Sequence, residues 1–255
     1  MAFLDAAAKP ARATGDFVLF TLEVAVVAFT RRLAWREALL QMWFVARVSI
    51  LPTLLLAIPF TVLTVFMLNI LLIEFGAADF SGVGASFTAV TQIGPIVTVL
   101  VVAGAGATAM CADLGARTIR EELDALRVLG IDTNQALVVT RVLAATLVAM
   151  LLSSAVSVVG LVGAYLFAVY AQHTNPGAFV ASLTLLVGLP EVIVALVKAA
   201  LFGLSASLIA CFKGTTVGGG PAGVGNAVNE TVVYSFIALF FINVIATAVG
   251  VKATA

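Results

Sequence analysis

Residues 48–73 read VSILPTLLLAIPFTVLTVFMLNILLI, a run of 26 residues without a single charged side chain. A helix that crosses the hydrocarbon core of a bilayer needs about 20 apolar residues, so this run predicts a transmembrane helix. Four further stretches are similarly apolar, with Lys198 as their one interior charge: residues 85–109, 142–170, 192–212 and 231–251. The sequence therefore predicts an all-α integral membrane protein with five spans.

The composition agrees with a lipid-facing exterior. Of the 255 residues 62% are hydrophobic and only 10% are charged, with 13 basic against 13 acidic side chains. A soluble domain carries about 25% charged residues, and a nucleic-acid-binding surface needs an excess of Lys and Arg. Two Cys and one His give neither a disulfide framework nor a metal-ligand spacing. These counts exclude a soluble enzyme, a nucleic-acid binder and a metal centre.

The positions of the basic residues predict an orientation. Eleven of the 13 Lys and Arg residues precede the first span, lie between spans two and three, or follow span four. The loops 74–84 and 171–191 contain none. Because basic residues stay in cytosolic loops, we expect a cytosolic N-terminus and an external C-terminus.

Residues 16–47 predict a membrane anchor before the first span. Apolar residues recur at helical spacing after Trp35, while Arg36 and Arg47 lie towards the other side. An amphipathic helix with Trp at its boundary typically lies in the plane of the interface, and we expect that arrangement here. The alternative is a poorly inserted span over residues 17–30.

The loop between spans two and three predicts a short amphipathic helix over residues 116–129, ended by Gly130. Such a helix can insert an apolar ridge into the groove of a partner protein, or it can rest on the membrane surface. Anionic headgroups attract basic rather than acidic side chains, so the acidic residues of this helix favour docking over membrane contact. The apolar positions are Ile119, Leu123, Leu126 and Leu129, and the charged ones Arg120, Glu121, Asp124 and Arg127.

Polar residues within the spans are candidates for function, because lipid penalises them. Gln92, Asn243 and Lys198 are of this kind. For Lys198 the structural alternatives are an ion pair with Glu191, seven residues earlier, or snorkelling of its side chain towards the interface. The glycine-rich loop 213–226 lacks the Gly-Lys-Ser/Thr ending of a phosphate-binding loop. We therefore expect no nucleotide hydrolysis, and no catalytic residue, on this chain.

Three long motifs resemble the MlaE/YrbE permease family, most closely its actinobacterial YrbE branch. They are QIGPIVTVLVVAGAGA at residues 92–107, ADLGARTIREELDALRVLGID at 112–132 and GGGPAGVGNAVNETVV at 218–233. Members of this family are the membrane subunits of lipid ABC transporters that work with Mce (mammalian cell entry) proteins. The resemblance implies an N-terminal interfacial helix, five spans and a cytosolic coupling helix.

The coupling helix of this family docks into a groove of the ATPase subunit. By resemblance that role falls on residues 116–129, with Glu121 and Glu122 at the matching acidic positions. The residues expected to couple to the ATPase are Arg117, Arg120, Glu121, Glu122, Leu123, Leu126 and Leu129.

The resemblance also implies a lipid cavity enclosed by two permease subunits, with Gln92, Pro95, Ala105 and Asn243 at the cavity or dimer interface. Many members have Glu, Arg and Asp where this chain has Gln92, Ala105 and Asn243, so a charged lining does not carry over. One hypothesis is a heterodimer whose unlike partner retains those charges; a homodimer is the alternative.

These features together predict the permease subunit of an ATP-driven lipid transporter, by resemblance an importer, in the bacterial plasma membrane. ATP and Mg²⁺ would be held by separate ATPase subunits, and this chain would need no cofactor or metal. Expected partners are a second permease, Mce proteins on the external side and a lipid, but no nucleic acid. An ATPase-independent transporter or channel and a non-transporting membrane scaffold are the alternatives.

Overall fold

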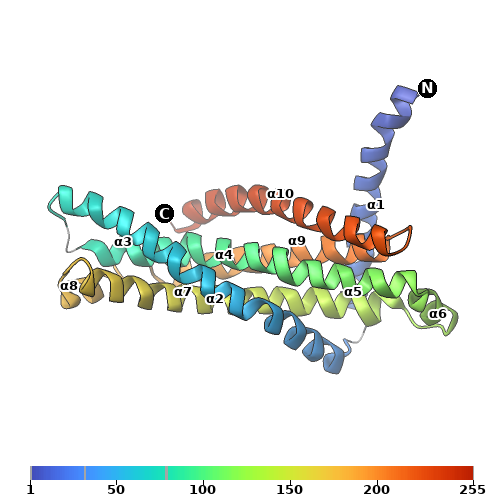
Figure 1. Cartoon of the computed structure of the whole chain (residues 1–255), viewed down its shortest axis with the longest axis horizontal. Helices are drawn as coiled ribbons and strands as arrows, with labels where there is room; N and C mark the ends of the chain where they lie inside the picture. The colour runs from blue at the N-terminus through green and yellow to red at the C-terminus, as the bar shows by residue number, and fades with distance from the viewer. Residues whose placement is uncertain (1, 32, 78–79, 255) are drawn as a thin grey trace.

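The computed structural model describes residues 2–31, 33–77 and 80–254, and all of their regular structure is helical (Figure 1). The α-helices are α1 (Ala2–Thr30), α2 (Trp35–Glu74), α3 (Ser81–Thr88), α4 (Gly94–Val101), α5 (Thr108–Ile119), α6 (Glu122–Val128), α7 (Thr140–Tyr170), α8 (Pro176–Ser182), α9 (Leu189–Thr215) and α10 (Pro221–Thr254). Three π-helical segments complete the order: η2 (Ala89–Ile93), η3 (Val102–Ala107) and η4 (Asn134–Val139).

Five helical stretches in the described part of the chain are long and apolar enough to cross a membrane, which confirms the predicted fold class and number of spans. They are Trp35–Leu72, Ser81–Ile119, Asn134–Tyr170, Leu189–Thr215 and Pro221–Gly250. Most extend well beyond the apolar runs that predicted them. The helices continue past the apolar runs because each backbone N–H there still donates to the carbonyl four residues earlier.

The sequence predicts one interfacial helix over residues 16–47. The structure instead divides this segment between two helices. α1 ends at Thr30, and α2 begins at Trp35 and continues without interruption into the first span. The amphipathic pattern from Trp35 onward therefore belongs to the start of the spanning helix. A pattern of period 3.6 identifies a helical face, but it does not reveal where a helix is interrupted.

The spans run roughly along the long axis of the molecule in Figure 1. α6 and the turn between α9 and α10 lie at one end, which we call the α6 end, and α3 and α8 lie at the other, the α8 end. α1 runs across the bundle near the α6 end and contacts η4 and α9 there. Phe17 and Phe20 of α1 pack against Phe212 of α9, with ring centroids 5.4 and 5.5 Å apart.

α7 packs against both α2 and α9, and small residues let these helices approach closely. A methyl group added at Gly203 of α9 would lie 2.7 Å from Ala149 Cβ and 2.9 Å from Ala145 O, both on α7. A methyl group at Gly160 of α7 would lie 2.7 Å from Thr61 Oγ1 of α2. In lipid, helices associate by such close packing, since burying apolar surface gives no net drive between them.

The outer helices leave broad apolar faces uncovered. Only 11% of the apolar window of α10 is buried inside the chain, against 61% for the Ser81–Ile119 span. Phe240, Phe241 and Val244 of α10 are each 68% exposed. In a membrane protein such a face meets lipid or another apolar chain.

The first prediction concerns the contact between α7 and α9. We expect Gly203→Ala to destabilise the chain by about 1–3 kcal/mol, because the new methyl group meets backbone and Cβ atoms of α7. The control is Gly163→Ala, where the nearest atom would lie 3.8 Å away, and which we expect to be neutral or stabilising by up to about 1 kcal/mol. The free energy of unfolding in lipid nanodiscs measures both; equal effects would contradict the assignment of Gly203 to a close helix contact.

Candidate functional site

The helix expected over residues 116–129 is two helices with a sharp corner between them. α5 ends at Ile119, Arg120 N donates to Ala116 O over 3.2 Å, and α6 begins at Glu122. Glu121, at the corner, has left-handed backbone angles (φ 60°, ψ 17°), which cost a residue other than Gly about 1–2 kcal/mol. The corner lets α6 leave the axis of the span.

α6 ends as the sequence predicts, at a glycine. Gly130 has φ 75°, and its N–H donates to Arg127 O over 3.0 Å. Asp132 then accepts the backbone N–H of Asn134 at 3.0 Å and starts η4, which continues into α7. Residues 113–141 thus form a hairpin between two spans, which we call the end hairpin.

The two faces of α6 have different surroundings. Leu123 is 4% exposed and Leu126 is partly buried, and both pack in a cluster with Val24 of α1 and Leu137 of η4. Val128 and Leu129, by contrast, are 88% and 73% exposed. Of the predicted apolar ridge, the structure places Leu123 and Leu126 against the protein's own core and leaves Leu129 on the outside.

Ion pairs of the end hairpin hold the corner between α5 and α6. Glu122 lies 3.0 Å from Arg120 Nε and 3.9 Å from Arg117 Nη1. Each such pair is worth about 0–1 kcal/mol at a surface, so together they position α6 rather than stabilise the fold. Glu121 is exposed and has no ion pair within the described residues, so its carboxylate faces outward.

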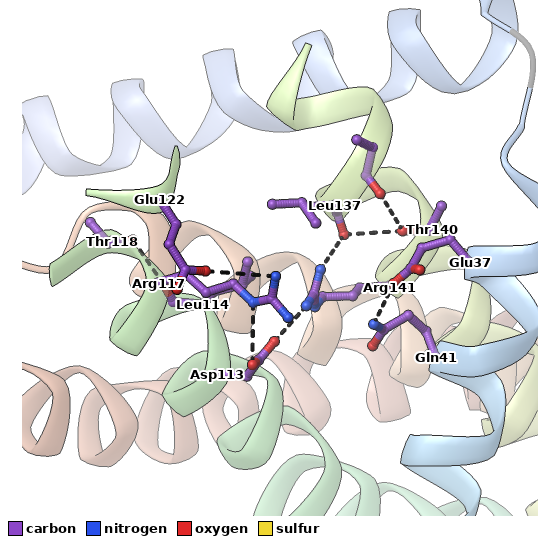
Figure 2. A network of polar contacts seen from close by, with 11 residues as sticks. Glu37, Gln41, Asp113, Leu114, Arg117, Thr118, Glu122, Leu137, Thr140 and Arg141 are labelled. Carbon is purple, nitrogen blue, oxygen red and sulfur yellow. Dashed lines mark hydrogen bonds and ion pairs between the residues drawn. The ribbon is translucent and has the colours of Figure 1, made fainter. Parts of the chain in front are cut away.

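An ion pair between a buried Arg and a partly exposed Asp lies at the base of the end hairpin (Figure 2). Arg141, at the start of α7, is 1% exposed; its Nη2 lies 2.5 Å from Asp113 Oδ2 and its Nη1 donates to Leu137 O over 3.0 Å. Asp113 Oδ1 also accepts from Arg117 Nε at 3.3 Å. Sequence reasoning missed this pair, because the two residues are 28 positions apart; the available signal was one Arg in the otherwise apolar stretch after Leu137.

The four residues predicted at a lipid cavity or dimer interface lie on η2, α4, η3 and α10. Gln92 of η2 lines a small cavity of about 80 Å³ with Thr91, Lys198 and Thr247. Pro95, Ala105 and Asn243 do not line it. Pro95 is buried in α4, whereas Ala105 lies in η3, about 15 Å further along the helix axis at 1.5 Å per residue. Asn243, on α10, has a buried Oδ1 with no hydrogen-bond partner in the described part of the chain.

Lys198 does not pair with Glu191, the structural alternative that its spacing suggested. Glu191 instead accepts the backbone N–H of Gly188 at 2.8 Å and caps α9. Lys198 is 2% exposed, and its Nζ lies 3.3 Å from Thr91 O, a carbonyl of η2. π-Helical turns interrupt the regular ladder of helical hydrogen bonds and are frequent at functional sites.

Five apolar spans and a polar hairpin that projects from one end define the class of the protein as a multi-pass α-helical membrane protein. Within that class, the Permease MlaE family model matches residues 38–249, and the chain belongs to this family.

Similar curated proteins agree with the family. A probable ABC transporter permease protein of Rickettsia typhi is 35% identical over 61% of this chain and 60% of its own length. A probable ABC transporter permease protein of Rickettsia bellii is 28% identical over 95% of this chain and 93% of its own. The intermembrane phospholipid transport system permease protein MlaE of Haemophilus influenzae is 25% identical over 71% and 69%. The chain thus spans less than two thirds of the Rickettsia typhi protein, but nearly all of the Rickettsia bellii one.

The two faces of α6 generate the second prediction. We expect Leu123→Ala to cost about 2–5 kcal/mol of unfolding free energy, because it empties a buried site. Leu129→Ala, a matched change on the outward side of the same hairpin, should stay within about 0.5 kcal/mol. Chemical unfolding in nanodiscs measures the difference, and a larger loss from Leu129→Ala would reverse the assignment of the two faces.

Proposed function

We propose that this chain is the membrane-spanning subunit of an ATP-driven lipid transporter, and that the end hairpin is its docking site for an ATPase. Membership of the MlaE permease family and relatives named as ABC transporter permeases support the transporter class. The name of the Haemophilus influenzae relative supports a phospholipid or similar lipid as cargo.

The observation that carries the docking proposal is the outward side of α6. It combines the exposed apolar residues Val128 and Leu129 with the exposed charges of Glu121, Asp124 and Arg127. An apolar anchor rimmed by charged side chains is the usual composition of a protein-binding surface. A helix resting on a bilayer would carry basic rather than acidic residues at its rim.

The α6 end is the cytosolic side in this proposal. The basic residues of α5, α6 and the start of α7 gather there, and Lys213 lies close to the turn that follows α9. The loops at the α8 end contain no Lys or Arg. By the positive-inside rule the hairpin faces the cytosol of a bacterial cell, where ATP is available, and the loops at the α8 end face outward.

In this proposal ATP hydrolysis and lipid transport are carried out by different subunits. A separate ATPase would bind ATP and Mg²⁺ and close on them, and the closure would push the end hairpin and shift the spans as packed bodies. Mce-type proteins at the α8 end would exchange lipid with the permease, with import as the proposed direction. The uncovered apolar face of α10 is a surface to which a second permease subunit could bind. The same face could form an apolar wall against a lipid.

The second permease is proposed to be an unlike chain. Gln92 and Asn243 are neutral, so a charged cavity lining would have to come from the partner. The chain expressed alone should then form no active dimer. Native mass spectrometry tests this, and a stable homodimer that supports lipid movement would contradict the heterodimer.

The fourth prediction tests docking. Because the outward side of α6 is the proposed contact, Leu129→Asp and Glu121→Lys should each weaken binding of the ATPase subunit at least about tenfold, the effect of losing about 1.4 kcal/mol. Leu186→Asp is the matched control, since Leu186 is 60% exposed at the α8 end. Pull-down with the ATPase subunit and ATP hydrolysis by the purified complex measure the effect. Unchanged binding by both hairpin variants would remove α6 from the interface.

Glu121 is a sharper target than Glu122. Glu122 pairs with Arg117 and Arg120 within the hairpin, so its replacement disturbs the corner as well as any partner. Glu121 makes no such pair within the described residues. Glu121→Gln keeps the side-chain shape and removes the charge, and it separates an electrostatic contribution to docking from a backbone effect.

The experiment that tests the proposed function as a whole is lipid analysis of the complex purified with and without ATP. The proposal expects bound lipid whose amount changes on ATP hydrolysis. Bound lipid that moves without any ATPase would indicate a secondary transporter or channel. Absence of bound lipid and of any response to nucleotide would indicate a scaffold.

A further inference from the structure

We infer that Asp113 is a positioning residue that links movement of α6 to movement of α7, through ion pairs with Arg117 on one side and Arg141 on the other. The inference deepens the proposed function and rests on it only for the source of the movement. The link itself is a property of this chain.

The tight side of the link is the pair with Arg141. A guanidinium that is 1% exposed needs a partner, since an unpaired buried charge is strongly destabilising. Asp113 Oδ2 supplies that partner at 2.5 Å and Leu137 O supplies a second one at 3.0 Å, while Arg141 Nε has no hydrogen-bond partner among the described residues. Few alternative contacts are available to Arg141, so this pair ties α5 firmly to the base of α7.

The loose side of the link leads to α6. Asp113 Oδ1 accepts from Arg117 Nε at 3.3 Å, and Arg117 Nη1 lies 3.9 Å from Glu122, the first residue of α6. The side chains of Arg117 and Glu122 are 35% and 42% exposed, so these contacts are weaker and can change length. One carboxylate therefore contacts a partly exposed Arg that leads to α6 and a buried Arg in α7, and Figure 2 shows both contacts.

α5 has little freedom to absorb a push from α6. Thr118 Oγ1 donates to Gly214 O of α9 at 2.9 Å. A methyl group added at Gly214 would lie 2.8 Å from Leu114 Cβ and 3.0 Å from Cys111 O, both on α5. Because α5 is in close contact with α9 and tied to Arg141, a displacement of α6 that reaches Asp113 is passed to α7 rather than lost in α5.

The first arm of the test uses the full-length chain alone in lipid nanodiscs and needs no ATPase. Glu122→Lys perturbs the start of α6, and hydrogen–deuterium exchange reports on residues 134–141, the segment that carries Leu137 and Arg141. The link predicts that Glu122→Lys raises exchange in 134–141 at least about fivefold, the low end of coupling between sites. Adding Asp113→Asn should reduce this increase to the part that passes through the direct packing of Leu123 and Leu126 on Leu137.

Two further variants keep this test decisive if Asp113→Asn folds poorly. Arg117→Gln removes the contact of Asp113 with Arg117 and leaves the Asp113–Arg141 pair intact, and it should reduce the increase in exchange to the same extent as Asp113→Asn. Arg120→Gln removes a contact of Glu122 that does not lead to Asp113, and it should leave the increase in exchange unchanged. No rise in exchange of residues 134–141 with Glu122→Lys alone, or an undiminished rise when Arg117→Gln is added, would overturn the inference.

The second arm uses the complex with the ATPase. At ATPase concentrations that saturate binding, Arg117→Gln should lower the amount of lipid moved per ATP at least about fivefold. Unchanged transport per ATP would contradict the role of the link in coupling. If the chain binds no ATPase while the first arm shows the expected changes in exchange, the proposed function fails and the link stands.

Discussion

Close packing against α7 is the constraint on which the rest of the structure depends. Apolar surface gives helices no reason to associate within lipid, so they must interlock where side chains are small. At Gly203, α9 lies in close contact with Ala145 and Ala149 of α7. At Gly160, α7 lies in close contact with Thr61 of α2. With α7 held on these contacts, α10 and the outer part of α2 can leave their apolar faces open to lipid or to a partner.

The ion pairs of the end hairpin lie at the start of α7, beyond its close contacts with α9 and α2. At its base Arg141 is buried among η4, α5 and α7, and Asp113 compensates its charge. The same carboxylate meets Arg117, which leads to the corner at Glu121 and Glu122. The end hairpin therefore has an inner part fixed to the bundle and an outer part, with Val128 and Leu129, available to a partner. This division suits a subunit that receives force at one end and shifts packed helices.

The sequence was sufficient for the class of fold, because lipid imposes long apolar runs that are visible without any structure. It was not sufficient for the helix interruptions. Residues 16–47 follow one helical pattern across the break before Trp35, and residues 116–129 follow one across the corner at Glu121. The period of a pattern also does not say which way its apolar side faces, so Leu123 and Leu129 looked equivalent, yet one is 4% and the other 73% exposed. The ion pair of Asp113 with Arg141 depends on tertiary contact between two spans, and the partner of Lys198 depends on a π-helical carbonyl.

The docking of an ATPase on the outward side of α6 is tested most directly by site-specific photocross-linking in the intact complex. A photoreactive residue would replace Val128, which is 88% exposed on the end hairpin, or Leu186, which is 60% exposed at the α8 end. The account predicts cross-links to the ATPase subunit from position 128 and none from position 186. Cross-links from 186 alone, or an ATPase that binds without contacting position 128, would contradict it.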